Sequence, residues 1–509
     1  MDLTPLVRLV WPIATALTVA TCATSPPPST AAAAAGSGAA LYARHCAVCH
    51  GADGSGDTVV SQLLRPRPNA FRLGLFKLVS TDNGMPSDDD LVATLRRGMP
   101  GSTMMSWGWL PDADLRALAA EVRRLAVHGR ADSIRRTALA TNRPITETEA
   151  IAAAEQELAP GDPIDVGTPV PPNADNLAEG ERLYRQHCSG CHGTDGRGLP
   201  ASADWPTDGT WLWPRDFTAG YLRGDATYRD LASRVRAGMP GAHMPPTRLS
   251  VAETEALVGY LQSLIAEDAS AHHTQWRRTV RVQQTGSLPA DDDAAAWARL
   301  DTVRLPLAPL WWRPEACSEL WLTAAHDGTD IALRLQWADA SRDDTAVPTS
   351  TISDGVAIQF APTLDPPLFA MGSAEQPVNV WRWHAYDPKV LAGMADLLGR
   401  THEGLDVPLG GTRPRPRGES LAFRGVASAA RETGSGLPLA VATEWRDGRW
   451  TATFRRSLHA RSSNEVDLAA ATPVLFAFAV WDAHLDRHAG SKAITTWHAL
   501  ELERRGTRR

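Results

Sequence analysis

The sequence HCAVCHGADGSG runs from His45 to Gly56, and HCSGCHGTDGRG runs from His187 to Gly198. Both copies contain C-x-x-C-H, in which two cysteines can bond to the vinyl groups of one haem and the histidine can ligate its iron. A zinc site made from two C-x-x-C pairs is the alternative, but it does not account for the histidine and the G-x-D-G-x-G that follow both pairs. The repeat therefore predicts two covalently bound haem c groups, held by Cys46, Cys49 and His50 in the first copy and by Cys188, Cys191 and His192 in the second.

A methionine follows each copy at nearly the same distance. When the two G-M-P-G phrases are aligned, Met104 falls opposite Met244, whereas Met105 falls opposite a proline. Met99 and Met239 lie between glycine and proline, so we expect them to be turn residues. We predict Met104 and Met244 as axial ligands; the alternative is that they are loop or core methionines. Ligation by histidine and methionine favours electron transfer over chemistry at an open iron.

Residues 37–128 and 176–267 each resemble a class I cytochrome c domain. The matching features are LYxxHCxxCHGxDGxG, then P-N-A-F or P-R-D-F-T, then DLxxxxRxGMPG, the methionine and a closing amphipathic segment. The closing segments, DADLRALAAEVRRLAV and VAETEALVGYLQSLIA, have the apolar spacing of helices with one buried face. The resemblance implies two all-α cytochrome c domains, which we place at residues 36–128 and 176–268.

The segment between these domains, residues 129–175, is predicted to be a linker. TETEAIAAAEQEL carries a capping-box pattern and predicts a short helix within it. The proline-rich APGDPIDVGTPVPPNADN that follows is expected to be extended.

The N-terminal residues 1–35 are predicted to be a signal peptide and a flexible leader. LVWPIATALTVATC is apolar but short and interrupted by proline, which favours a secretory signal over a membrane span. TVATC resembles a lipobox, so a lipid anchor at Cys22 is an alternative, although Thr21 is unusual before such a cysteine. Because haem c is attached outside the cytoplasm in bacteria, both signals predict a periplasmic protein. The net charge of −7 and the lack of a basic block argue against nucleic acid as a partner.

Residues 270–509 have a different sequence pattern, in which short apolar runs typical of β-strands alternate with turn signals. HDGTD and WRDGRW each lie between two such runs and predict hairpins. Many short strands with these turns predict an all-β sandwich domain. Taken alone, the pattern also fits a carbohydrate-binding or purely structural sandwich.

Two phrases in this region resemble the haem-binding domain of ethylbenzene-dehydrogenase type. They are PLFAMGSAEQPVNVWRWHA and FAVWDAHLDRHAGSKAITTWHALEL. Domains of this type are γ subunits of periplasmic molybdenum enzymes of the dimethyl sulfoxide reductase family. The resemblance implies one noncovalent haem b held by Met371 and Lys492. His384 stands where many relatives carry another polar residue, so a His384–Met371 pair stays open as an alternative.

Three haems and no recognisable catalytic constellation predict an electron-transfer subunit. The resemblance implies three partners: a molybdopterin catalytic subunit, an iron–sulfur subunit and a soluble or membrane redox carrier. One alternative is a dihaem enzyme that oxidises a small sulfur compound, but such enzymes usually replace one axial methionine or leave a site open. Another is a dihaem carrier tethered by a ligand-binding sandwich.

Overall fold

The computed structural model describes most of the chain after the leader. The predicted signal peptide, the leader and Cys22 lie outside the described residues. Among those described, no helix is long and apolar enough to cross a membrane. The residues whose structure is described are 37–171, 173–198, 214–242, 244–265, 272–313, 315–344, 353–361, 363, 366, 371–373, 376–385, 418–425, 437–462, 465–469, 473–484 and 492–503.

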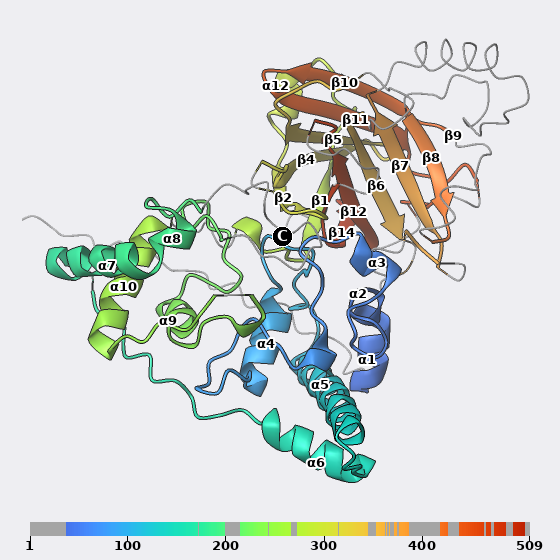
Figure 1. The fold of residues 1–509 in the computed structure, drawn as a ribbon. Helices are drawn as coiled ribbons and strands as arrows, with labels where there is room; N and C mark the ends of the chain where they lie inside the picture. Colours follow the sequence, from blue (N-terminus) through green and yellow to red (C-terminus); the bar gives the residue numbers. More distant parts are fainter. Residues whose placement is uncertain are drawn as a thin grey trace, which may run out of the picture. The chain divides into compact units, whose positions relative to one another are not determined.

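The first repeat is helical (Figure 1). Its long helix α5 (Asp112–Ala140) buries Leu115 and Leu118 completely. Helix α1 (Gly38–His45) crosses α5 closely at Gly38. A Cβ atom at Gly38 would lie 2.2 Å from the carbonyl oxygen of Ala117, so only glycine permits this approach. The elements are α1 (Gly38–His45), α2 (Ala47–His50), α3 (Val59–Gln62), η1 (Phe71–Leu73), α4 (Asp88–Arg97) and α5 (Asp112–Ala140).

The second repeat has the same helix crossing. A Cβ atom at Gly180 would lie 2.2 Å from the carbonyl oxygen of Ala256, and Gly180 precedes its haem-binding motif as Gly38 precedes the first. The two helical domains expected from the repeated sequence are confirmed. The elements here are α7 (Ala174–His187), α8 (Ser189–His192), α9 (Tyr228–Ala237), η2 (Pro240–Ala242) and α10 (Val251–Leu264).

The boundary placed at residue 128 does not coincide with the end of a helix. Helix α5 continues to Ala140, because no proline or interior glycine pair interrupts the segment after residue 128. Helix α6 (Glu147–Glu157) forms where the capping-box pattern predicted it, with Thr146 as N-cap. Its Ala150 and Ala154 are fully buried in the hydrophobic core of the first repeat. Part of the predicted linker therefore belongs to the first domain.

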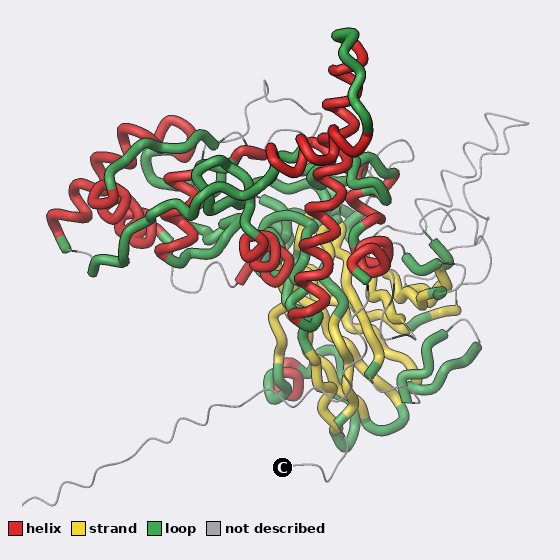
Figure 2. Tube along the Cα trace, turned by 90° about the horizontal axis from the view of Figure 1, so that it is seen from below, coloured by secondary structure: helices red, strands yellow, loops and turns green. Residues whose placement is uncertain are grey.

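The C-terminal region is built from strands, as expected from its alternating sequence. Figure 2 shows the strands in yellow. Apart from the short helix α12 (Ala294–Trp297), its elements are β1 (Thr279–Gln284), β2 (Thr302–Pro306), β3 (Ala308–Pro309), β4 (Glu319–His326), β5 (Asp330–Ala338), β6 (Gly355–Ala361), β7 (Val378–His384), β8 (Gly418–Phe423), β9 (Leu437–Pro438), β10 (Ala440–Arg446), β11 (Arg449–Ser457), β12 (Val474–Trp481), β13 (Ala493–Ile494) and β14 (His498–Leu502).

Strand β1 joins the two halves of this sandwich. Its first part, from Thr279 to Val282, pairs in parallel with β14, and its last two residues pair in parallel with β4. The strand order is β10-β11-β5-β4-β1-β14-β12-β6-β7-β8-β9, with β2, β3 and β13 paired at the side. Large side chains from both halves form one buried core, among them Trp337, Trp381, Phe360, Phe454 and Phe476.

Both predicted hairpins are present. HDGTD connects β4 to β5, which pair antiparallel. WRDGRW connects β10 to β11, with Asp447 at φ 51° and Gly448 at φ 72°. Two successive positive φ values are the geometry of a tight turn that matches the twist of the flanking strands.

Candidate haem sites

The two C-x-x-C-H motifs adopt the same backbone turn. The amide of His50 donates to the carbonyl oxygen of Cys46 at 2.9 Å, and the amide of His192 donates to that of Cys188 at the same distance. In each repeat the first cysteine lies at the junction of two helices, so the second cysteine and the histidine follow within one helical turn. This turn places both thiols and the imidazole of one motif close together, as covalent haem attachment requires.

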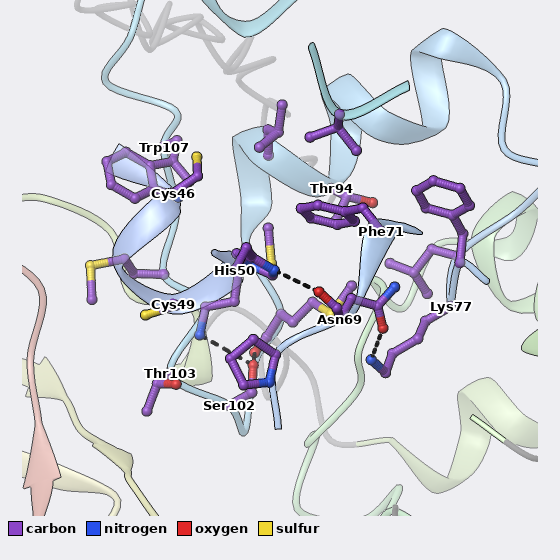
Figure 3. Close-up of a pocket in the computed structure, with 18 of the residues that line it drawn as sticks. Cys46, Cys49, His50, Asn69, Phe71, Lys77, Thr94, Ser102, Thr103 and Trp107 are labelled. Atoms are coloured by element: carbon purple, nitrogen blue, oxygen red, sulfur yellow. Dashed lines mark hydrogen bonds between the residues drawn. The ribbon is translucent and has the colours of Figure 1, made fainter. Parts of the chain in front are cut away.

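Each histidine predicted to bind haem is oriented by a backbone carbonyl. The Nδ1 of His50 lies 3.0 Å from the carbonyl oxygen of Asn69 (Figure 3), and the Nδ1 of His192 lies 3.3 Å from that of Arg215. A carbonyl only accepts, so Nδ1 carries the hydrogen and the lone pair of Nε2 is left for a metal. Burial lowers the pKa of His50 to about 4, which keeps its ring neutral.

A phenylalanine ring stacks on each of these imidazoles. The ring centroids of His50 and Phe71 are 4.5 Å apart, and those of His192 and Phe217 are also 4.5 Å apart. These are the phenylalanines of the P-N-A-F and P-R-D-F-T phrases. The shared phenylalanines therefore fix the plane of each imidazole that is predicted to ligate iron.

The backbone supports the predicted register of the methionines. The amide of Met99 donates to the carbonyl oxygen of Met104 at 2.8 Å, and the amide of Met239 donates to that of Met244 at the same distance. Met104 and Met244 are thus equivalent, and Met105 has no methionine counterpart. Met104 lines the same cavity as Cys46 and His50.

Because Met105 also lines that cavity, spectroscopy of single variants is needed to show which of Met104 and Met105 is the axial ligand. We expect Met104→Ala to abolish the near-infrared charge-transfer band of Met–Fe(III) ligation at the first haem, since it removes the sixth ligand. Met105→Ala should retain that band, and the Met244 band should persist in both variants. If Met105→Ala removes the band while Met104→Ala keeps it, the register is wrong by one residue.

A second cavity in the β domain brings together the two residues proposed for haem b. Met371 and Lys492 both line it, although they are far apart in the sequence, and Trp481 and Trp497 line it too. The Nζ of Lys492 lies 5.2 Å from the ring centroid of Trp481. An apolar, aromatic cavity with a thioether and an amine suits a flat, largely apolar cofactor.

Both side chains show a local property that fits ligation. Burial lowers the pKa of Lys492 to about 8, which makes it easier for the ammonium to lose the proton that blocks its lone pair. Met371 has φ 46°, a strained value for a residue other than glycine, and Gly425 donates to its carbonyl oxygen at 3.1 Å. His384 is not among the residues that line this cavity; its ring lies 5.3 Å from that of Trp481.

The side chains in these cavities that were not selected from the sequence include Met105, Lys77 and Arg223. Met105 lines both cavities, and Lys77 and Arg223 line the first one. The only sequence signal for Met105 was its lack of a counterpart in the second repeat. Nothing in the sequence connects Arg223, which belongs to the second repeat, with the haem of the first.

Three protein-family models match successive parts of the chain. The model described as cytochrome C oxidase, cbb3-type, subunit III matches residues 33–120, and the cytochrome c model matches residues 177–264. The ethylbenzene dehydrogenase model matches residues 294–493. The first two matches fall on the two helical repeats, and the third falls on the strand-rich region.

Three curated proteins are similar to part of the chain. A putative respiratory nitrate reductase heme subunit, ORF7, of Haloferax mediterranei is 28% identical over 217 residues, covering 41% of this chain and 67% of that protein. The dimethylsulfide dehydrogenase subunit gamma of Rhodovulum sulfidophilum is 26% identical over 41% of this chain and 72% of its own length. The chlorate reductase subunit gamma of Ideonella dechloratans is 24% identical over 45% of this chain and 86% of its own length.

Proposed function

We propose that this chain, which joins two cytochrome c-type domains to an ethylbenzene dehydrogenase-type domain, is the haem subunit of a periplasmic molybdenum oxidoreductase. The cytochrome c domains carry covalent haem c, and the third domain carries haem b. The subunit passes electrons between the catalytic and iron–sulfur subunits of that enzyme and a redox carrier. Its similarity to haem and gamma subunits of nitrate, dimethylsulfide and chlorate enzymes supports this role.

The position of Met105 carries the proposal. This side chain is only 3% exposed, and it lines both the cavity that contains His50 and the cavity that contains Lys492. The two cavities therefore share one buried lining side chain. Neighbouring cofactor cavities suit conduction of electrons between them, whereas a carrier that is merely tethered by a sugar-binding domain does not require them.

Hydrogen bonds hold the first cytochrome domain against the β domain at this place. Arg65 donates through its amide to the carbonyl oxygen of Leu310 at 2.7 Å and accepts from the amide of Trp312 at 2.8 Å. The indole of Trp311 donates to the carbonyl oxygen of Leu63 at 3.1 Å. The residues Gly36–Arg509 form one compact unit, so this contact is part of the folded subunit.

The proposed ligands agree with a conducting role. When bound, each haem supplies an iron that changes between Fe(III) and Fe(II) and so takes up or releases one electron. His50 with Met104, and His192 with Met244, would occupy both axial positions and keep small substrates away from the iron. This set of ligands favours the electron carrier over the alternative of a dihaem enzyme.

Isolation of the native complex tests the proposal. We expect the affinity-tagged chain, purified from its own host, to retain molybdenum at a 1:1 ratio to the chain and non-haem iron in excess of that ratio, because each iron–sulfur cluster holds several irons. Metal analysis together with haem content measures both. An unrelated periplasmic cytochrome with the same tag should retain neither. A fully haem-loaded chain that purifies without molybdenum, or that oxidises a small sulfur compound by itself, contradicts the proposal.

A further inference from the structure

Two buried cations line the cavity of the first haem. Lys77 is 8% exposed and Arg223 is 7% exposed, and both side chains line the cavity that contains His50. Lys77 donates to the side-chain oxygen of Asn69 (Figure 3). Within the described parts of the chain, no ion pair joins either cation to a carboxylate. A buried charge is costly unless an opposite charge pairs with it.

The two cations also oppose each other. Burial, and to a lesser extent the charge of Arg223, lower the pKa of Lys77 to about 7. Burial lowers the pKa of Arg223 to about 10. When both groups are protonated they are like charges in a poorly solvated place, an arrangement that an anionic ligand would stabilise.

Contacts between the repeats fix the place where Arg223 reaches the cavity. The guanidinium of Arg234 donates to the carbonyl oxygen of Val79 at 2.5 Å, and the amide of Gly241 donates to that of Phe76 at 3.0 Å. Both acceptors flank Lys77 in the sequence. The second repeat therefore packs directly on the segment of the first repeat that carries Lys77.

We propose that Lys77 and Arg223 bind the two propionate carboxylates of the first haem, so that the second repeat completes the cofactor site of the first. A haem carries two carboxylates, and the cavity offers two cations on chain segments that pack together. Charge-assisted hydrogen bonds from an ammonium and a guanidinium are strong partners for carboxylates. The inference rests on the covalent attachment of haem at Cys46 and Cys49, which is measured separately by counting covalent haems.

The experiment compares Arg223→Gln with Arg229→Gln in the full-length, haem-loaded chain. Arg229 is an exposed arginine of the same repeat, so it is a matched control. Arg223→Gln should lower the reduction potential of the first haem only, because a cation near the iron disfavours the more positive Fe(III) state. It should also shift the propionate bending band of that haem in resonance Raman spectra. Lys77→Gln should act in the same direction, and Arg223→Lys should restore most of the potential.

Three results would overturn the proposal. The first is an Arg223→Gln variant whose first-haem potential and propionate band match those of Arg229→Gln. The second is a potential shift that falls on the second haem instead. The third is a shift that Arg223→Lys does not reverse although all haems remain bound, because that points to packing instead of charge. Both covalent haems should remain attached in every variant. The test measures the potential of the first haem and does not depend on whether the chain passes electrons to a molybdenum enzyme.

Discussion

Replacing both Cys188 and Cys191 with alanine leaves the protein with one covalent haem in place of two. The thioether bonds are the only covalent links between haem and chain, so their loss removes that haem after denaturation. Cys46 and Cys49 form the same turn independently and should keep their haem. Intact mass and haem-stained denaturing gels measure the number of covalent haems directly.

Cys317 provides the matched control for this experiment. It is a cysteine outside the two motifs, and its thiol donates to the carbonyl oxygen of Glu319 at 3.4 Å. Cys317→Ala should retain two covalent haems. A wild-type mass that corresponds to zinc or to a chain without haem refutes the covalent assignment altogether.

The second large effect concerns the haem of the β domain. We expect Lys492→Ala and Met371→Ala each to remove most of the haem that acid–acetone extracts, while both covalent haems stay attached. Each substitution deletes one of the two side chains that could ligate an iron from the cavity they share. The measurement is the pyridine haemochrome content of the extract and of the residue, compared with wild type.

Two comparison variants decide whether this loss is specific. Met85→Ala removes a methionine of the first repeat that packs on the helical core, and it should leave the extractable haem unchanged. His384→Ala should also keep it, since His384 lies outside the residues that line the cavity. If His384→Ala removes the haem and Lys492→Ala does not, histidine is the ligand and the assignment of lysine is wrong.

Local patterns predicted most of the architecture. The repeated motif, the capping box at Thr146 and the turn residues Asp447 and Gly448 act through neighbours in the chain, so the sequence reveals them directly. Helix α5 was placed too short because a closing helix was expected to end with its domain, whereas its extension is stabilised by packing against α6. That contact depends on residues beyond the repeat.

The parts of the sites that the sequence did not reveal come from long-range contacts. Met105 was set aside because the second repeat lacks it, yet its side chain lines the cavity of the β domain as well as that of the first repeat. Arg223 enters the first cavity from the other repeat. A single sequence contains no local pattern for a side chain that serves a neighbouring domain, so only the folded chain places it.

The long-range contacts of strand β1 and Gln275 affect the order in which the haem sites of the chain form. The side chain of Gln275 donates to the carbonyl oxygen of Ile494 at 3.2 Å and accepts from the amide of Thr496 at 2.8 Å, while its own carbonyl accepts from Ser106. Strand β1 needs β14, at the far end of the chain. Contacts between residues this distant form late. The turns of the two C-x-x-C-H motifs use only neighbouring residues and can form early, whereas the cavity of the noncovalent haem needs Lys492, which follows Met371 by more than a hundred residues.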